Sequence, residues 1–449
     1  MSQIIVHVTS LGCAKNLVDT EVMCGAIVSS GMFIAERPED ANVRLINTCS
    51  FIKDARDEAE RHIREALTWK RAARGQRRAV VVAGCLAQRY PNETRRRFPG
   101  IDLLLGLDDV PHAADLIRQA LEGDGATHAV NPALPTYLYD ETTPRLPVTP
   151  GSYAYLKIAE GCDHQCAFCA IPLFRGRQRS RSVASVLAEC RQLLNLGVKE
   201  INLIAQDSSR YGLERGDGAS LTALLREIDR LDGDFWVRVL YTHPLHTGDD
   251  LLETLASSRH VVPYLDMPIQ HVATNVLQAM RRGMTGPQLT ARLRDIRRNF
   301  PSLTLRTTVL LGFPGETDDD FRQLLDFVQD FRFDRLGAFA FSPEDGTPAM
   351  RLLADAPDTR TAELRRDAIL ETQLDIAAEN NRRLVGKTQT LLLEEQLDAT
   401  HWLARSQADA PEVDQTITVA SRRKRPAFIS ATITAAHDCD LEARETPAH

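Results

Sequence analysis

The sequence predicts an α/β protein with three domains: an N-terminal open parallel α/β domain, a central partial (β/α)6 TIM-like barrel, and a C-terminal small antiparallel β-barrel. Three observations support this prediction. The chain of 449 residues has room for two or three domains of roughly 150 residues each. Apolar runs alternate with helical patterns over most of its length, which is typical of parallel sheets covered by helices. Near the C-terminus, short β-like runs replace that alternation, as in a small barrel.

The N-terminal domain is expected over residues 1–122. Its strands are predicted at four apolar runs, namely Gln3–Thr9, Val43–Asn47, Ala79–Ala83 and Leu103–Gly106. Helical patterns between these runs cover Asn16–Ser30 and Ile52–Ala73. Residues 123–150 are predicted to form a linker, because proline is frequent there and no periodic segment is long.

The central domain is expected over residues 151–383 and the terminal domain over 384–449. Strands of the central domain are predicted at Tyr153–Ala159, Glu200–Ala205, Trp236–Tyr241, Val261–Met267, Thr304–Leu311 and Leu336–Phe341. Six such units favour a partial barrel over the closed form with eight units. A charged amphipathic helix over Pro357–Arg383 then leads into the terminal domain. Strands of that domain are predicted at Thr388–Glu394, His401–Ala404, Thr416–Val419 and Ala427–Ala435.

Composition excludes some classes of protein. The N-terminus has no signal-peptide pattern, and no run approaches the ~18 apolar residues of a membrane span. We therefore expect a cytoplasmic protein without a membrane partner. Nine cysteines in a reducing compartment indicate metal or redox chemistry rather than disulfides. A net charge of −7 argues against a protein that works mainly on naked nucleic acid.

Three cysteines, Cys162, Cys166 and Cys169, stand in the string AEGCDHQCAFCAIP. They follow the first predicted barrel strand, at the mouth where barrel enzymes have their active sites. Three thiolates at this spacing can ligate three irons of a cubane cluster and leave the fourth iron open for chemistry. Zinc is the alternative, but zinc usually takes four ligands in paired spacings. His164, within the string, is expected to face solvent.

A second trio consists of Cys13, Cys49 and Cys85, which are 36 residues apart at each step. Each follows a predicted strand, and the carboxyl ends of parallel strands meet at one edge of a sheet. Gly12 and Gly84 would let the backbone approach a bulky group. A buried cysteine can also be a small hydrophobic residue, but three at equivalent points favour a second cluster. The other cysteines, Cys24, Cys190 and Cys439, are assigned to packing.

The CxxxCxxC spacing, with the aromatic Phe168 before its last cysteine, resembles the signature of the radical S-adenosylmethionine superfamily. With the second trio and the terminal barrel, the whole chain resembles the methylthiotransferase family. This resemblance implies two [4Fe-4S] clusters, with S-adenosylmethionine bound to the open iron of the central one and cleaved to a 5′-deoxyadenosyl radical. It implies that the N-terminal cluster carries the sulfur, which another S-adenosylmethionine methylates. It also implies a TRAM-like terminal domain that recognises substrate, and an electron donor of flavodoxin or ferredoxin type.

The resemblance further implies contacts to S-adenosylmethionine near the barrel mouth. The expected residues are Phe168, Gln206, Asp207, Gln270 and Arg306. A turn or cap role is the alternative, as Asp207 could cap a helix. The basic stretch Arg175–Arg181 is expected to contact substrate or cofactor through forked hydrogen bonds, and a solvated loop is the alternative. No catalytic residue is assigned.

The string SLGCAKNLVDTE (Ser10–Glu21) resembles the branch that modifies the β-carbon of an aspartate in small ribosomal subunit protein twelve. Residues from Asn381 to His449 carry a net charge of −1, which suits a basic protein partner better than a phosphate backbone. Nucleic acid contact, at the run Arg422–Arg425, is therefore expected to be secondary at most. The alternatives are the same chemistry on adenosine of transfer RNA, and a zinc-stabilised binding protein without turnover.

Overall fold

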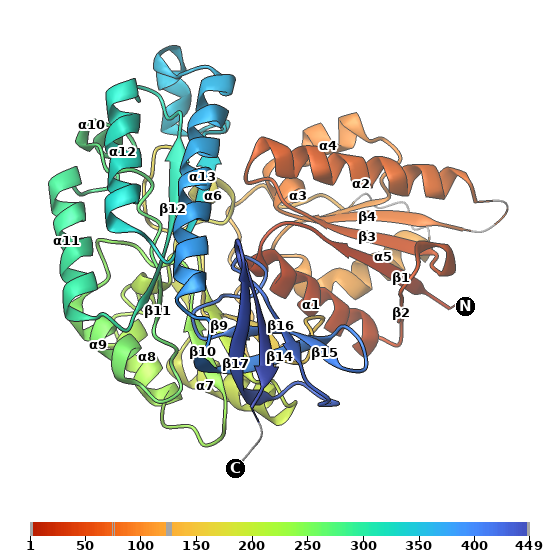
Figure 1. Ribbon diagram of the computed structural model, residues 1–449. Helices are drawn as coiled ribbons and strands as arrows, with labels where there is room; N and C mark the ends of the chain where they lie inside the picture. The colour runs from red at the N-terminus through yellow and green to blue at the C-terminus, as the bar shows by residue number, and fades with distance from the viewer. Residues whose placement is uncertain (1–2, 74, 76, 123–127, 447–449) are drawn as a thin grey trace.

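The computed structural model describes residues 3–73, 75, 77–122 and 128–446. It has three parts: an N-terminal α/β unit, a central barrel-like unit with helices on its outside, and a small β-barrel that lies against both (Figure 1). Within the described residues, no helix combines the length and apolar character needed to span a membrane.

The N-terminal unit is a parallel sheet of five strands in the order β2-β1-β3-β4-β5. The strands are β1 (Ile5–Ser10), β2 (Phe33–Ala35), β3 (Val43–Thr48), β4 (Ala79–Gly84) and β5 (Leu103–Leu105). Four of them confirm the prediction from apolar runs. The edge strand β2 was not predicted, because it has three residues and exposes Phe33 and Ile34, so it leaves no burial pattern in the sequence.

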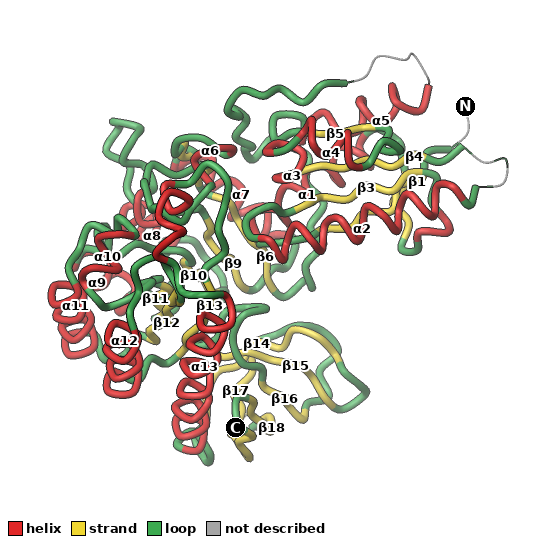
Figure 2. The backbone as a smooth tube through the Cα atoms, turned by 90° about the horizontal axis from the view of Figure 1, so that it is seen from above, coloured by secondary structure: helices red, strands yellow, loops and turns green. Residues whose placement is uncertain are grey.

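Helices cover both faces of this sheet, as Figure 2 shows from above. One face packs against α1 (Ala14–Ser29) and α5 (Ala113–Glu122), and the other against α2 (Lys53–Arg71). The alternation of side chains along β4 explains the two layers, since Val81 joins the first core and Val82 the second. Shorter helices complete the unit: η1 (Pro38–Asp40), α3 (Cys85–Arg89), α4 (Pro91–Arg97) and η2 (Val110–His112).

The described part of the predicted linker, residues 128–150, contains no helix or strand, yet it is firmly attached. Arg145 donates to Glu21 of α1 at 2.5 Å and to Glu189 of α7 (Val183–Asn195) at 2.5 Å. Both carboxylates and the guanidinium are buried. The segment therefore joins the first two units through a buried ion pair on each side. Residues 123–127 of the predicted linker lie outside the described residues.

The central unit contains the six predicted strands as two parallel sheets, β10-β9-β6 and β11-β12-β13, joined by a bridge between Val237 and Val261. The strands are β6 (Tyr153–Lys157), β9 (Glu200–Ile204), β10 (Trp236–Val239), β11 (Tyr264–Asp266), β12 (Thr304–Leu311) and β13 (Arg335–Ala340). A short hairpin was not predicted: β7 (Ala159–Glu160) and β8 (Arg179–Ser180). The helices are α6 (Ile171–Phe174), α7, η3 (Ser208–Arg210), α8 (Leu221–Ile228), α9 (Asp249–Ser257), α10 (Thr274–Ala279), α11 (Gly286–Asn299), α12 (Asp318–Phe331) and η4 (Pro348–Asp355). The partial barrel is thus confirmed.

After α13 (Thr359–Arg382) the chain forms a closed five-stranded barrel in the order β14-β15-β16-β18-β17. Its strands are β14 (Thr388–Gln396), β15 (His401–Ser406), β16 (Ile417–Ala420), β17 (Phe428–His437) and β18 (Asp440–Glu445). The expectation of a wholly antiparallel barrel needs a correction, because β16 and β18 pair in parallel. This pairing closes the barrel through a strand that the sequence did not predict. Its two buried apolar residues, Leu441 and Ala443, alternate with exposed ones. Cys439, before this strand, is exposed, so its assignment to packing was wrong.

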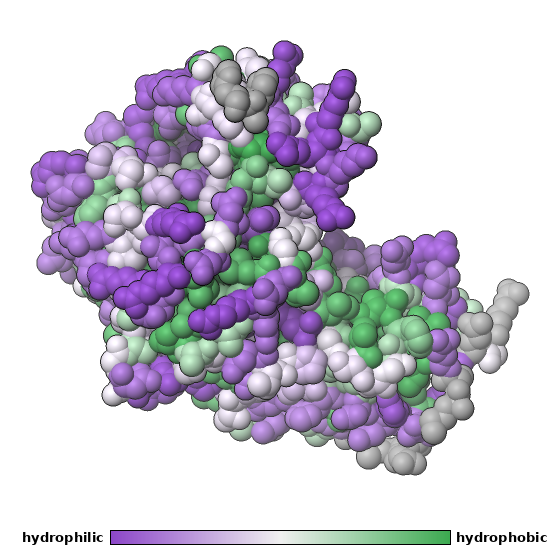
Figure 3. Space-filling view, turned by 90° about the horizontal axis from the view of Figure 1, so that it is seen from below, coloured by the Kyte–Doolittle hydropathy of each residue, from purple (hydrophilic) through white to green (hydrophobic). Residues whose placement is uncertain are grey.

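The terminal barrel is attached to the central unit through buried charges. Glu200 accepts from Arg238 at 2.7 Å and from Arg405 of β15 at 2.6 Å, and Arg405 also donates to Glu394 at 2.5 Å. A shared apolar core adds Leu392 to residues of the first two units. The three units therefore share apolar cores and ion pairs. On the surface seen from below, apolar patches lie among polar side chains (Figure 3).

Candidate functional site

The N-terminal cysteines lie at the carboxyl ends of three neighbouring strands, as predicted from their spacing. Cys13, Cys49 and Cys85 follow β1, β3 and β4, which are adjacent in the sheet. Gly12 has a φ of 92°, and a Cβ atom there would lie 2.6 Å from Cβ and 3.0 Å from Sγ of Cys49. Gly84 has a φ of 90°, and a Cβ atom there would lie 2.2 Å from Oδ1 of Asn47. Glycine at both positions thus permits the close approach of the cysteine loops.

Cationic side chains surround this trio. Nη2 of Arg175 donates to Sγ of Cys85 at 3.1 Å. Surrounding protein atoms disfavour ionisation of Cys13 although its surface is exposed, but the charges of Lys15 and Arg175 bring its pKa below the ordinary value. Burial raises the pKa of Cys85 to about 12 despite the same guanidinium. Three sulfurs at one sheet edge beside fixed positive charge are a suitable donor set for a metal cluster that carries negative charge.

The second trio lies in the loop after β7, where Cys162 and Cys166 are buried and Cys169 is partly buried. The backbone N–H of Cys169 donates to the carbonyl of Cys166 at 3.1 Å, which curls the loop. Nη1 of Arg282 donates to Sγ of Cys166 at 3.4 Å. Burial raises the pKa values of Cys162 and Cys169 to about 12. This loop again combines three thiols with one buried guanidinium, so it fits a cluster with one open metal position.

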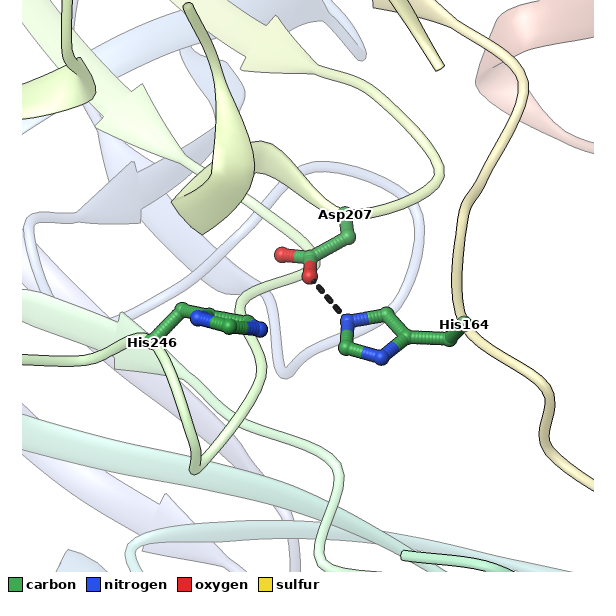
Figure 4. Close-up of side chains that lie close together, drawn as sticks. All are labelled: His164, Asp207 and His246. Atoms are coloured by element: carbon green, nitrogen blue, oxygen red, sulfur yellow. Dashed lines mark hydrogen bonds and ion pairs between the residues drawn. The ribbon is translucent and has the colours of Figure 1, made fainter. Parts of the chain in front are cut away.

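A group of histidines borders this loop (Figure 4). Nε2 of His164 lies 2.6 Å from Oδ2 of Asp207, and its ring stacks on that of His243 with 4.0 Å between centroids. His246 lies beside this pair, with its centroid 5.3 Å from that of His164. The expectation that His164 faces solvent was therefore wrong. A carboxylate from the end of β9 holds it against the barrel.

Four of the five residues expected to contact S-adenosylmethionine have side-chain partners in the protein: Phe168, Gln206, Asp207 and Arg306. Phe168 packs in a small apolar core, and Gln206 donates to Glu160 at 2.7 Å. Asp207 accepts from the backbone N–H of Ser209, so its alternative role as a cap is confirmed. The expected contacts of these three residues with the cofactor remain predictions.

The other two expected contacts lie farther along the barrel. Gln270 has a φ of 71°, a conformation that is rare outside glycine and common at functional sites. Arg306 lies 2.9 Å from Asp266 and 3.4 Å from Asp414, so it links the barrel to the loop before β16. For both, contact with S-adenosylmethionine remains a prediction.

A buried group of charged residues joins α1 to the barrel beside the N-terminal trio, and apart from Arg175 its members were not predicted. Lys157 donates to Asp19 of α1 at 2.5 Å and to Glu160 at 2.7 Å, and Arg175 lies 2.8 Å from Glu160 and 3.3 Å from Asp19. The alternative of a solvated basic loop is therefore wrong for Arg175, although it describes the exposed Arg177. The position of Asp19, one turn after Lys15 in a helix that follows a cysteine, was the signal available in the sequence.

Comparisons with known proteins agree with this three-part division. Residues 156–328 match a family model described as the radical SAM superfamily, residues 385–445 match a TRAM domain, and residues 5–106 match the uncharacterized protein family UPF0004. The ribosomal protein uS12 methylthiotransferase RimO of Opitutus terrae is 40% identical, with 97% of this chain and 95% of that protein covered. The protein of the same name from Syntrophus aciditrophicus is 40% identical, with 98% of both chains covered.

A solved structure of similar fold is the radical S-adenosylmethionine methyltransferase TsrM from Kitasatospora setae, with cobalamin and a [4Fe-4S] cluster bound. It is 19% identical, the TM-score is 0.57, and the match covers 78% of this chain and 77% of that one. At this identity the likeness concerns the fold alone.

Proposed function

Since this chain belongs to the family of ribosomal protein uS12 methylthiotransferases within the radical SAM superfamily, we propose that it places a methylthio group on the β-carbon of an aspartyl residue of uS12. The main support for this proposal is that the chain matches proteins of that name over nearly their whole length. The presence of two separate cysteine trios in one chain supports it.

Each trio would hold one [4Fe-4S] cluster. The ligands of the N-terminal cluster would be Cys13, Cys49 and Cys85. Those of the central cluster would be Cys162, Cys166 and Cys169. When bound, the central cluster with S-adenosylmethionine supplies the radical that removes hydrogen, and the N-terminal cluster supplies the methylated sulfur. The chemistry belongs to these groups, whereas the chain binds and orients them.

The side chains around the trios have three tasks. Arg175 and Arg282 donate to ligand sulfurs, which favours the ionised form that binds metal. The Asp19, Lys157 and Glu160 group fixes α1 against the barrel, and so fixes the distance between the two trios. Cys49, Cys85, Cys162 and Cys166 are buried, so most of the ligand sulfurs are shielded from water.

We also propose the accessory features that follow from this function. The domains are 1–122, 151–383 and 384–449, with 123–150 as the connection. The terminal barrel recognises uS12, and contact with nucleic acid at Arg422–Arg425 is secondary at most. These four side chains are exposed, but the domain as a whole carries more acidic than basic residues. The protein acts in the cytoplasm with an electron donor of flavodoxin or ferredoxin type.

The test is an anaerobic reconstitution followed by incubation with S-adenosylmethionine, a reductant and purified uS12. We expect about eight irons per chain, as two cubane clusters require, and a methylthio adduct on one aspartate by mass spectrometry. A modified transfer RNA nucleoside beside unmodified uS12 would instead support the adenosine branch. Stoichiometric zinc without 5′-deoxyadenosine would support a binding protein.

A further inference from the structure

Lys15 extends from the N-terminal unit onto the mouth of the barrel. It lies in the first turn of α1, two residues after Cys13. Its Nζ donates to the carbonyl of Ala205 at 3.2 Å and lies 3.6 Å from the centroid of the Tyr241 ring. Ala205 follows β9 and Tyr241 lies just beyond β10. The ammonium group therefore lies between the N-terminal trio and the carboxyl ends of two barrel strands.

This ammonium has no carboxylate partner in the part of the chain that the structure describes. Lys15 is only 8% exposed, yet no carboxylate oxygen of a described residue lies within 4.0 Å of its nitrogen. Lys157, the other buried lysine of this region, has two carboxylate partners. One carbonyl and the face of one ring offset only part of the cost of burying a positive charge. Lys15 can therefore accept a carboxylate as a further partner, and no described residue of the chain provides one.

Lys15 lowers the pKa of Cys13 through its charge, but among the described residues its ammonium donates no hydrogen bond to a sulfur. In each trio a guanidinium already donates to a sulfur, Arg175 to Cys85 and Arg282 to Cys166. The hydrogen bond of Lys15 goes to the barrel instead. Cys13 is exposed, so the space beside Lys15 can be reached.

The ring below Lys15 belongs to Tyr241, whose backbone has a strained conformation. Tyr241 has a φ of 64°, which is costly for a bulky residue and is maintained only where the surroundings enforce it. Its backbone N–H donates to Oδ2 of Asp266 at 2.8 Å, and its carbonyl accepts from the backbone N–H of Ser208 at 2.8 Å. These bonds keep the ring in place as one wall of the ammonium site.

We propose that Lys15 binds the side-chain carboxylate of the substrate aspartate. This inference rests on the proposed function and identifies the group that selects its substrate. The carbon to be modified is bonded directly to that carboxylate carbon, so fixing the carboxylate on Lys15 places the carbon between the N-terminal trio and the barrel mouth. The ammonium gains its counter-ion only when an acidic residue of the right length enters. Asparagine at the same position would leave the charge unpaired.

The experiment measures binding to reconstituted enzyme with S-adenosylmethionine present. The probes are uS12 and a uS12 variant with asparagine in place of the modified aspartate. We expect the unaltered enzyme to bind the aspartate form about tenfold or more tightly. Lys15→Met should bind both forms equally weakly, and Lys15→Arg should keep part of the preference. Lys53→Met removes an exposed lysine of the same unit and should keep all of it.

Two further readouts separate the outcomes. Iron content and the electron paramagnetic resonance signal of the N-terminal cluster should be unchanged in Lys15→Met. If that variant keeps the preference for aspartate but its cluster signal shifts, Lys15 is a counter-ion of the cluster and the inference is wrong. If Lys15→Met does not fold, the comparison rests on Lys15→Arg and Lys15→Gln. Failure of the unaltered enzyme to modify uS12 would overturn the proposed function itself.

Discussion

Arg175 of the central unit donates a hydrogen bond to Sγ of Cys85 in the N-terminal unit, with 3.1 Å between nitrogen and sulfur. The same guanidinium is paired with Asp19 and Glu160, one from each unit. One buried side chain therefore contacts a proposed cluster ligand and the charges that join the units.

Replacing Arg175 by glutamine should destabilise the protein strongly. The change leaves Asp19 and Glu160 with one cation fewer in a buried setting, and breaking such pairs costs about 3–5 kcal/mol. We expect a lower midpoint of denaturant unfolding, and a changed electron paramagnetic resonance spectrum of the N-terminal cluster in reconstituted protein. Arg177→Gln, at an exposed position of the same loop, is the matched control. Equal midpoints for the two variants would contradict the prediction.

Gly12→Ala should prevent formation of the N-terminal cluster. The added Cβ would lie 2.6 Å from Cβ of Cys49, so the ligand itself would have to move. We expect about half the iron of the unaltered protein, because one of two cubane clusters is lost. Gly31→Ala separates strain from collision, since its φ of 83° is similar but nothing lies within 4 Å of the added atom. That control should cost about 1 kcal/mol and keep its iron.

Cys166→Ala and Cys49→Ala should lose different activities. The first removes a proposed ligand of the central cluster, so formation of 5′-deoxyadenosine should stop. The second leaves that loop intact, and we expect cofactor cleavage to continue without transfer of sulfur. Chromatography of the nucleoside and mass spectrometry of uS12 measure the two outcomes. Cys190→Ala, at a buried cysteine outside both trios, should keep both activities.

Glu200→Gln should loosen the terminal barrel. Burial opposes ionisation of Glu200, but Arg238 and Arg405 hold its pKa below the ordinary value. Neutralising Glu200 removes the negative charge that both buried guanidinium groups share. We expect this to lower the free energy of unfolding by about 3–5 kcal/mol. Limited proteolysis should then cut near residue 384 and release the terminal barrel faster than in the unaltered protein. Glu227→Gln removes an exposed carboxylate of the same unit and should leave the cleavage rate unchanged.

Stability should decrease below neutral pH partly through His271. Burial lowers the pKa of His271 from 6.5 to about 4, so between these values the unfolded chain binds a proton that the folded protein does not. The free energy of unfolding should therefore fall as pH decreases from 6.5 to 4, by at most about 1.4 kcal/mol per pH unit. His271→Asn should reduce this slope, whereas His112→Asn at an exposed position should not. Identical slopes for all three proteins would show that His271 is not responsible.

Much of the fold could be predicted because buried parallel strands are continuous apolar runs. Val43–Thr48 and Ala79–Gly84 are buried at every residue, and both were predicted almost to their ends. The edge strand β2 and the closing strand β18 were missed, since an exposed or half-exposed strand has a weak pattern. The pairing of β18 with β16 depends on contacts far apart in the chain and leaves no local signal.

The cysteines of the site could be predicted for the same topological reason, since strand order brings Cys13, Cys49 and Cys85 to one edge. The buried charged side chains could not be predicted. Nothing local distinguishes Lys15 from a surface lysine, because its burial depends on Ala205 and Tyr241, which are about 200 residues away in sequence. Arg175 likewise has neighbours that only tertiary structure supplies.

The two cysteine trios come together at different stages of chain folding. Cys162, Cys166 and Cys169 lie within a single turn-rich loop, so they are close together as soon as that short segment has been made. Cys13, Cys49 and Cys85 come together only after β1, β3 and β4 have paired in register. If this edge holds the proposed cluster, a chain whose strands pair out of register would lack the site and would not retain iron there.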